Sequence, residues 1–284
     1  YQAKLMPDVI RTKHVAFRPI DIKMGPDGAI YIADWYNPII QHGEVDFRDP
    51  RRDHVHGRIW RVTAKGRPLV PRRQPQRSKI SQLVSSLAAP EMWVRRQARR
   101  ALQERPFDQR EEIVAELDRW CAQIDPQRVD AGSLALEALW TFQAFDVVRD
   151  ELLAGLLKSA DPQVRTAACR IAAGFPTSCQ RELAALVRDP HPRVRLEAVR
   201  SLAGRDSGDD GGKLANNPTL PAVMAALEAD RDATLDYALW LTAWERRNRW
   251  LPRIKKGDYR FLDDDRQLLF VLSSVRDPAI VPAV

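Results

Sequence analysis

The chain repeats itself from about residue 79 onward, and this periodicity limits the folds open to it more than any other feature. A small residue returns at comparable places in five segments, at Ala98, Ala138, Ala168, Ala198 and Ala238. Successive alanines are 40, 30, 30 and 40 residues apart. Periods in this range are typical of stacked pairs of helices, and small residues are expected where neighbouring helices approach closely. The sequence therefore predicts a helical array over residues 79–284.

Two of the repeats carry an Asp-Pro turn before their second helix, Asp161-Pro162 and Asp189-Pro190. An aspartate there caps the next helix, and a proline near its first position costs no hydrogen bond. The segments DPQVRTAACRIA and DPHPRVRLEAVRSLA resemble HEAT repeats, in which the aspartate and an arginine typically pair between or within units. The resemblance implies pairs of Asp161 with Arg165 and of Asp189 with Arg195.

Other repeats are less regular. Residues 111–146 and 218–248 lack the Asp-Pro turn and the arginine, so they are placed by spacing alone, and Leu251 to Val275 is expected to begin a sixth, weaker unit. The insertion Arg205 to Asn217 explains one of the longer steps. Its aspartates do not fall on the alternating ligand positions of an EF-hand, which favours a surface loop over a calcium site. They are Asp206, Asp209 and Asp210.

A short β segment is predicted ahead of the array. Ile20 to Lys23 and Ala29 to Ala33 alternate in polarity around the turn Pro26-Asp27-Gly28, as in a β-hairpin, and Arg58 to Thr63 is a third strand. The next stretch is rich in proline and basic residues, as in an extended, solvated linker. The predicted organisation is mainly α: a β segment at 1–63, a linker at 64–78 and an array of about five to six units at 79–284, the last one truncated.

The β segment also resembles a known family. PDGAIYIADWYNP, then His42, then RDPRRDHVHGRIWRV, resemble the sugar-dehydrogenase-like β-propeller of membrane-bound dehydrogenases from Planctomycetes-type (PVC) bacteria, which continue into HEAT repeats and a haem-binding CxxCH domain. The resemblance in sequence covers about the first 65 residues. The order of a β segment followed by HEAT-like repeats extends the resemblance along the chain. It implies that residues 1–63 are the end of a propeller whose parent protein is exported, periplasmic or membrane-associated, and oxidises a sugar or alcohol with a quinone and haem c.

Both ends of the chain look truncated, at Tyr1 and soon after Asp277-Pro278. A propeller needs typically four to eight blades around its channel, and one blade cannot enclose a pocket. We therefore expect this chain alone to be inactive and to bind no cofactor.

Histidines gather between the second and third strands, at His42, His54 and His56. In an extended segment His54 and His56 lie on one side, as a single metal ion can require, and His42 with Asp34 or Asp53 could complete such a site. Three interpretations stay open: loop packing, a substrate or cofactor site, and a metal site. The dehydrogenase resemblance implies a histidine base and a nearby arginine, so the candidate catalytic residues, with no base assigned, are His42, His54, His56 and Arg58.

The charge and the cysteine content argue against some classes of function. The chain has a net charge of +7, and residues 1–77 hold 15 basic and 8 acidic residues whereas the remainder is balanced, which argues against nucleic-acid binding by the array. No CxxC or CxxCH occurs among Cys121, Cys169 and Cys179, although a Cys169 to Cys179 disulfide stays open. No apolar run approaches the roughly 20 residues of a membrane span.

Four tryptophans lie in the repeats, where helical spacing predicts core positions rather than a ligand cage: Trp93, Trp140, Trp240 and Trp244. Trp35 and Trp60 lie at strand ends. Two functions remain. The chain is a non-catalytic part of a haem-linked dehydrogenase, in which the array docks a protein partner or the adjacent haem domain. Alternatively, it is a stand-alone HEAT scaffold whose concave face binds protein.

Overall fold

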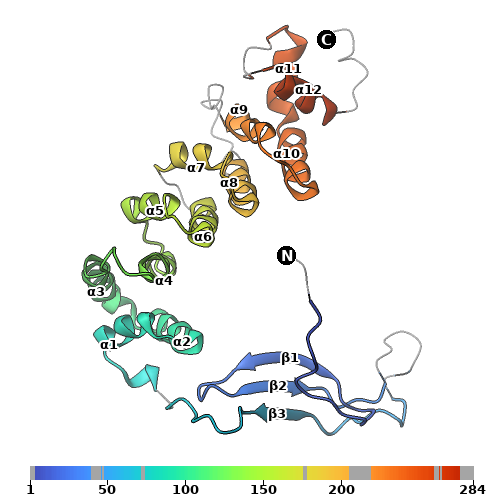
Figure 1. Cartoon of the computed structure of the whole chain (residues 1–284), viewed down its shortest axis with the longest axis vertical. Coiled ribbons are helices and arrows are strands. Elements are labelled where there is room, and N and C mark those ends of the chain that lie inside the picture. Colours follow the sequence, from blue (N-terminus) through green and yellow to red (C-terminus); the bar gives the residue numbers. More distant parts are fainter. Residues whose placement is uncertain are drawn as a thin grey trace. The chain divides into compact units, whose positions relative to one another are not determined.

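A computed structural model describes residues 4–39, 46, 48–71, 74–174, 178–204, 219–258, 262 and 264–275 (Figure 1). The chain divides into two compact units, residues 1–101 and 102–284. The described residues are mainly helical, with one short antiparallel sheet before the helices, as predicted. His42 and the insertion Arg205 to Asn217 lie outside the described residues, so the predictions made for them stay predictions.

Unit 1 begins with a three-stranded sheet of β1 (Pro19–Met24), β2 (Ile30–Asp34) and β3 (Arg58–Val62), paired in that order. Both pairings are antiparallel, and Ile22, Ile32 and Trp60 lie side by side across the sheet. The turn between β1 and β2 contains Gly28 at φ 76°, a left-handed conformation that glycine adopts without strain. The predicted hairpin and third strand are therefore confirmed.

The two faces of this sheet differ in polarity. One face carries Lys23, Tyr31 and Arg61, and Arg61 donates two hydrogen bonds to Asp27 Oδ2, at 2.9 and 2.6 Å. The strand register places apolar residues on the other face, namely Ile22, Met24, Ile30, Ile32, Trp60 and Val62. Of these only Ile32 is fully buried, and every residue of β1 is exposed. Within the described residues, unit 1 therefore leaves most of an apolar sheet face uncovered.

The proline-rich segment after β3 lies against the hairpin instead of being fully solvated. Val70 N donates to Asp27 O at 2.9 Å, and a Cβ added to Gly28 would come within 3.0 Å of Val70 Cγ2. Pro75 is buried in the short 3₁₀ helix η1 (Pro75–Arg77). The remaining elements of unit 1 are α1 (Ile80–Ser85), η2 (Ser86–Ala88) and α2 (Met92–Gln103), whose last two residues belong to unit 2.

Unit 2 continues with helices that follow one another in pairs. Figure 1 shows that α4, α6, α8 and α10 succeed each other in one row, beside a second row of the helices that precede them. Contacts join successive members of the first row, and each of its helices also contacts its predecessor in sequence. The elements are η3 (Phe107–Gln109), α3 (Arg110–Ala122), α4 (Ala131–Gln143), α5 (Asp150–Leu157), α6 (Pro162–Ala173), α7 (Gln180–Leu186), α8 (Pro192–Gly204), α9 (Thr219–Met224), η5 (Ala225–Glu228), α10 (Ala233–Glu245), α11 (Arg247–Lys255) and α12 (Asp265–Ser273).

Small residues and capped turns build these pairs largely as the sequence predicts. Ala138, Ala168 and Ala198 have no exposed surface, so the second helices can approach their neighbours closely. Asp161 caps α6 by accepting a hydrogen bond from Gln163 N at 2.8 Å, and the helix begins at the following proline. The second Asp-Pro turn differs, because α8 begins two residues after Pro190, at Pro192.

The predicted register of α10 was wrong by one residue. Leu235 and Leu239 are the buried positions, whereas Thr234 is exposed and Ala238 is only partly buried. The reason is the cap: Asp232 accepts from the backbone N–H groups of residues 234 and 235, so the first buried position falls three residues after it, as Val164 falls after Asp161. The predicted sixth unit corresponds to α11 and α12.

None of the three cysteines forms a disulfide within the described residues. Cys169 is completely buried, and burial, with smaller contributions from the charges of Glu197 and Asp189, raises the pKa of its thiol to about 12. Burial likewise raises the pKa of Cys121 to about 11. Cys169 and Cys179 are both buried, and they form no disulfide with each other. Within the described part of the chain, no helix is long and apolar enough to cross a membrane.

Candidate functional site

Asp34, at the end of β2, ties three segments of unit 1 together. Its Oδ1 accepts from Arg18 N at 2.7 Å and from Tyr36 N at 3.0 Å, and its Oδ2 accepts from Trp60 Nε1 at 2.9 Å. Burial by itself would raise the pKa of this carboxyl, but these hydrogen bonds and the nearby Arg58 charge hold it below its usual range. Both oxygens are thus engaged in structural hydrogen bonds.

Tyr36 begins the loop between β2 and β3 in a strained conformation. Its φ is 51°, in the left-handed region that residues with a side chain rarely adopt. The ring stacks on His14 with centroids 5.5 Å apart, and the Arg58 guanidinium lies 3.6 Å from the ring centroid. Arg58 also lies 5.8 Å from the centroid of Trp60. The candidate Arg58 is therefore held by aromatic rings, at the strand position paired with Asp34, which lies two residues before Tyr36.

The other candidates lie at the far end of that loop. Asp53 Oδ2 is 3.0 Å from His56 Nδ1, and Asp53 Oδ1 accepts from the backbone N–H groups of residues 55 and 56 at 2.9 Å. These backbone bonds, and then the His56 ring, lower the pKa of Asp53 to about 2. His54 and His56 are both exposed.

The structure brings together only part of the predicted set. It joins Asp53 to His56, but it commits Asp34 to the strands. Among the described residues, no group of three histidine, cysteine or acidic side chains is arranged to hold a metal ion, and His42 is not among them. Asp53 and His56 thus form an Asx-type turn with a histidine contact, and the metal and catalytic interpretations stay predictions.

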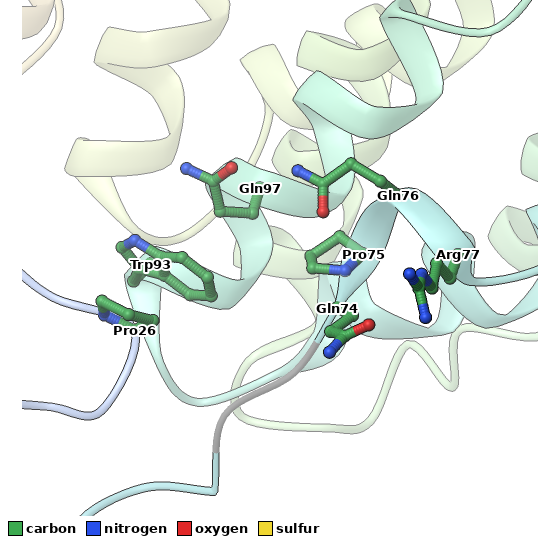
Figure 2. A pocket seen from close by; sticks show the side chains of 7 residues that line it. All are labelled: Pro26, Gln74, Pro75, Gln76, Arg77, Trp93 and Gln97. Carbon is green, nitrogen blue, oxygen red and sulfur yellow. The ribbon is translucent and has the colours of Figure 1, made fainter.

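A hollow of about 270 Å³ lies in unit 1 between the hairpin turn, η1 and α2. Figure 2 shows Trp93 and Gln97 of α2 facing it, with Pro26 from the hairpin beside the Trp93 ring. The other lining residues are Gln74, Pro75, Gln76 and Arg77. The hollow is at the small end for ligand pockets and has one charged side chain and no acid, histidine or nucleophile in its lining. The hollow could hold a small molecule, but its lining offers no residue suited to catalysis.

Three arginines occupy the same place in three repeats and make the same contacts. Arg95, Arg165 and Arg195 each donate through Nη1 to the backbone carbonyls five and six residues earlier, at 2.7 to 3.1 Å. Such carbonyls, in the turn before the second helix, would otherwise need water or another donor. Each arginine therefore closes the turn of its own repeat.

In Arg165 and Arg195 the opposite edge of the guanidinium contacts the next repeat. Arg165 Nε and Nη2 lie 2.8 and 2.9 Å from Asp189 Oδ2 and Oδ1, in a nearly buried bidentate pair. Arg195 Nη2 donates to Asp230 O at 2.6 Å. The expected pairs of Asp161 with Arg165 and of Asp189 with Arg195 were wrong, because Asp161 is used as a cap and Arg195 binds the Asp189 carbonyl instead of its carboxylate.

Glu197, on α8, gathers three further arginines. Only 3% of its side chain is exposed, yet its carboxylate lies 2.8 Å from Arg170 Nη2, 3.0 Å from Arg193 Nη2 and 3.5 Å from Arg200 Nη1. Arg170 comes from α6 and the others from α8, so the cluster joins two successive second helices. The guanidiniums surround a buried charge while their own side chains stay one third to two thirds exposed.

The next second helix, α10, carries a row of stacked aromatic rings at the surface. Tyr237 stacks on Trp240 with centroids 6.0 Å apart, and Trp240 stacks on Trp244 at 6.2 Å. Their exposed fractions are 61%, 37% and 39%, so the prediction that Trp240 and Trp244 are core residues was wrong. The guanidinium of Arg247 lies 4.0 Å from the Trp244 ring centroid. Trp93 and Trp140 are partly buried.

The position of these rings follows from helical geometry. Leu235 and Leu239 fill the buried side of α10, and residues 237 and 244 project from its opposite side at 100° per residue. A helix with apolar residues on both sides is a signal that could have identified this row from the sequence. We call the exposed surface of α10 formed by Tyr237, Trp240 and Trp244 the second-helix face.

Comparisons with known proteins support the repeat architecture. Residues 149–240 match HEAT repeats, and residues 2–66 match a domain of unknown function, DUF7133. No curated protein matches the chain. Two engineered proteins with crystal structures are similar: one is 17% identical with a TM-score of 0.42, covering 70% of this chain and 99% of its own, and the other is 18% identical with a TM-score of 0.37, covering 72% and 96%. The HEAT match and the order of the helices and strands show a HEAT-like helical solenoid preceded by a short three-stranded sheet.

Proposed function

We propose that the helical solenoid is a protein-binding scaffold and that the second-helix face is its binding surface. HEAT repeats suggest a scaffold or interaction module in general. The observation that carries the proposal for this chain is the row of Tyr237, Trp240 and Trp244, which stays exposed on α10 although the helix has a separate buried side.

Exposed stacked rings of this kind suit a protein interface. Tyrosine, tryptophan and arginine are enriched among the residues that contribute most to binding energy, and they cluster in central patches. Here the guanidinium of Arg247 lies 4.0 Å from the centroid of the Trp244 ring. Contiguous exposed apolar patches rimmed by polar groups mark interaction sites more often than chance exposure does.

Site-specific cross-linking tests the proposal in cells that make the protein. We expect a photoreactive phenylalanine analogue at position 237 to cross-link a defined protein, identified by mass spectrometry. A second substitution, Trp240→Ala, should remove that cross-link because it takes away the central ring of the stack. The matched control places the analogue at Phe107, an exposed ring near Arg110 and outside the second-helix face. Cross-links that are identical at positions 237 and 107, or that survive Trp240→Ala, would contradict the proposal.

A second proposal concerns unit 1, and it rests on the uncovered apolar sheet face. We propose that β1 to β3 belong to a larger β structure of an exported or membrane-associated oxidoreductase with a quinone and haem c, in line with the dehydrogenase resemblance. The support is that β1 is exposed along its whole length and that Ile22 and Met24 are 61% and 55% exposed. An isolated sheet of this size normally needs packing on its apolar face.

Activity of the intact gene product tests this second proposal. We expect it to reduce an artificial electron acceptor in the presence of a sugar or alcohol, and His54→Ala to lower that rate by about tenfold or more if His54 acts in acid–base catalysis. The matched control is His191→Ala, an exposed histidine in a turn of unit 2. No acceptor reduction with any sugar or alcohol would count against the oxidoreductase, and an unchanged rate in His54→Ala would reject that residue's role.

A further inference from the structure

We propose that the hollow between the hairpin turn, η1 and α2 binds a proline-rich segment of another protein in the polyproline II conformation. The ring of a prolyl residue would lie against Trp93, and the carbonyls of the peptide would accept hydrogen bonds from side chains of the lining. All lining residues belong to unit 1, so this site is separate from the second-helix face and depends on neither proposed function.

Three rings give the hollow a rigid apolar part. Trp93 lies on α2, and Pro26 of the hairpin turn lies beside its indole ring (Figure 2). Pro75 is buried in η1. The ring of a proline fixes its backbone φ, and the hairpin is closed by the hydrogen bond from Gly25 N to Ala29 O at 2.8 Å. The apolar walls are therefore in place before any ligand arrives.

Helical spacing places an amide next to the indole. Gln97 follows Trp93 by four residues on α2, so the two share one side of the helix, and Figure 2 shows both facing the hollow. Val94 and Ala98, one residue further on in each case, are 3% and 1% exposed. The buried side of α2 holds the helix in unit 1, and its other side presents an aromatic ring together with an amide.

The hydrogen-bonding groups of the lining are unused, and most of them are donors. Within the part of the chain that the structure describes, no hydrogen bond or ion pair is made by the polar side chains of the lining, namely those of Gln74, Gln76, Arg77, Trp93 and Gln97. The indole and the guanidinium can only donate, and each amide has two N–H groups beside one carbonyl. A prolyl residue has a carbonyl but no N–H, so a proline-rich backbone only accepts and complements this lining.

The size of the hollow favours part of a chain over a whole small molecule. Its volume is about 270 Å³, whereas pockets that bury most of a drug-sized ligand measure roughly 300–1,000 Å³. A flexible peptide that binds in so small a hollow loses backbone entropy at each residue that becomes ordered. A polyproline II segment is already extended and has no internal hydrogen bonds, so it loses less when it docks on an aromatic-lined surface.

The charge around the hollow predicts which residues flank the prolines. Residues 64–105 contain eleven basic and two acidic residues, and the lining itself contains Arg77 and no acid. Arg96, one turn along α2 from the indole, is exposed and makes no ion pair with any described residue. Asp27 of the hairpin turn is already paired with Arg61. We therefore expect acidic residues, and not basic ones, on either side of the prolines.

Basic residues and an aromatic ring also occur where single-stranded nucleic acid binds. Such surfaces stack successive bases on several aromatic rings along a basic path. The lining of this hollow contains one aromatic ring, flanked by prolines and amides. That combination suits a peptide backbone better than a row of bases.

Titration of a labelled peptide with the full chain tests the proposal. The probe has eight prolines between pairs of aspartates and a fluorescent label, and binding is measured as fluorescence anisotropy. We expect saturable binding of this probe and no binding of a matched probe in which glycine and serine replace the prolines. A third probe, with arginines in place of the aspartates, should bind about threefold more weakly, which is the size of an exposed charge interaction.

Substitutions in the hollow sharpen the test. Trp93→Ala should weaken binding of the aspartate-flanked probe by about tenfold or more, the loss typical of a tryptophan at the centre of an interface. Gln97→Ala should weaken it about two- to tenfold through one lost hydrogen bond, and alanine preserves the helix if the larger substitution disturbs the fold. The matched control is Met92→Ala, an exposed residue of α2 outside the lining, which should leave binding unchanged.

Several results would overturn the proposal. They are the absence of saturable binding, equal binding of the proline probe and the glycine and serine probe, and equal effects of Gln97→Ala and Met92→Ala. A single-stranded oligonucleotide that binds more tightly than the proline probe, and no longer binds after Trp93→Ala, would assign the hollow to nucleic acid instead. Tighter binding of the arginine-flanked probe would overturn the predicted acidic flanks.

Discussion

The two units hold their residues together over different distances along the chain. In unit 1 the side-chain contacts of Asp34 and Asp27 join residues 16, 26 and 34 positions apart, namely Arg18, Trp60 and Arg61. In unit 2 the arginines bind carbonyls five or six residues away and then the turn of the next repeat, as Arg165 binds Asp189, 24 residues on. Unit 1 therefore depends on the carboxylates of Asp34 and Asp27, whereas unit 2 uses the same kind of arginine contact in successive repeats.

This difference predicts how many structural elements a single substitution destabilises in each unit. Removal of a shared carboxylate in unit 1 should loosen all three strands at once, because the same oxygens hold the chain before β1, the end of β2 and the middle of β3. Removal of one arginine contact in unit 2 should weaken a single junction between repeats, since in repeat proteins each repeat contacts mainly its neighbours.

The largest expected effect comes from Asp189→Ala. It leaves the nearly buried Arg165 guanidinium without its carboxylate, and breaking a buried pair in this way typically costs about 3–5 kcal/mol. We expect the free energy of unfolding of unit 2 to fall by about that amount in chemical denaturation followed by far-ultraviolet circular dichroism. The matched control, Glu228→Ala, breaks the exposed pair with Arg188 and should cost less than about 1 kcal/mol. Equal losses in both variants would mean that burial of the pair has no influence.

The next largest effect is expected from Asp34→Ala in unit 1. Three donors in partly buried hydrogen bonds lose their acceptor, among them the Trp60 indole. A fully buried donor without a partner costs about 1–3 kcal/mol, so we expect a loss at the lower end of that range. Amide hydrogen exchange should accelerate in β1, β2 and β3 together, with protection in α6 and α8 unchanged. The control is Asp21→Ala, which removes an exposed carboxylate paired with Lys23 on the neighbouring strand β1. Faster exchange confined to one strand would contradict the view that Asp34 joins three segments.

The smallest effect is a dependence on acid. Because the pKa of Asp34 is lower in the folded protein than in the unfolded chain, its contribution is complete above about pH 4, the ordinary pKa of aspartate, and is lost as the pH falls through the lower folded value. Exchange protection of the three strands should therefore decline on acidification below about pH 4. Asp34→Asn should remove much of that decline. An identical acid response in wild type and Asp34→Asn would assign the effect to other carboxyls.

Local patterns in the sequence were enough for the repeats and the strands. The hairpin turn at Gly28, the cap at Asp161 and the small residues at Ala138, Ala168 and Ala198 each follow from a propensity that acts within a few residues. The α10 register failed by one residue because the alanine spacing was followed there in place of the Asp232 cap. Because a capping residue fixes where a helix starts, it predicts the register of that helix better than the repeat period does.

The surface features were harder to anticipate because they depend on neighbours. Asp189 could have capped its own helix, and only the packed structure shows that Arg165 of the preceding repeat reaches it. Helical spacing alone placed Trp240 and Trp244 in the core, since the sequence does not say which of two apolar sides a neighbour covers. Tyr36, strained at the start of the loop, carries no sequence signal except its place after Asp34 and Trp35.

Arg165 and Arg195 suggest how this part of the array could gain or lose repeats, because each holds its own turn and contacts the next repeat. Arg165 holds its own turn with one edge of the guanidinium and the following turn with the other, so a duplicated copy of a whole repeat would bring along both the donor and the acceptor of its junction. A gene that gained or lost one such module would keep the remaining junctions intact. Inserting even one residue between Ser159 and Arg165 would shift the backbone carbonyls to which the guanidinium donates. We therefore expect the length of the array to vary by complete repeats and not by parts of a repeat.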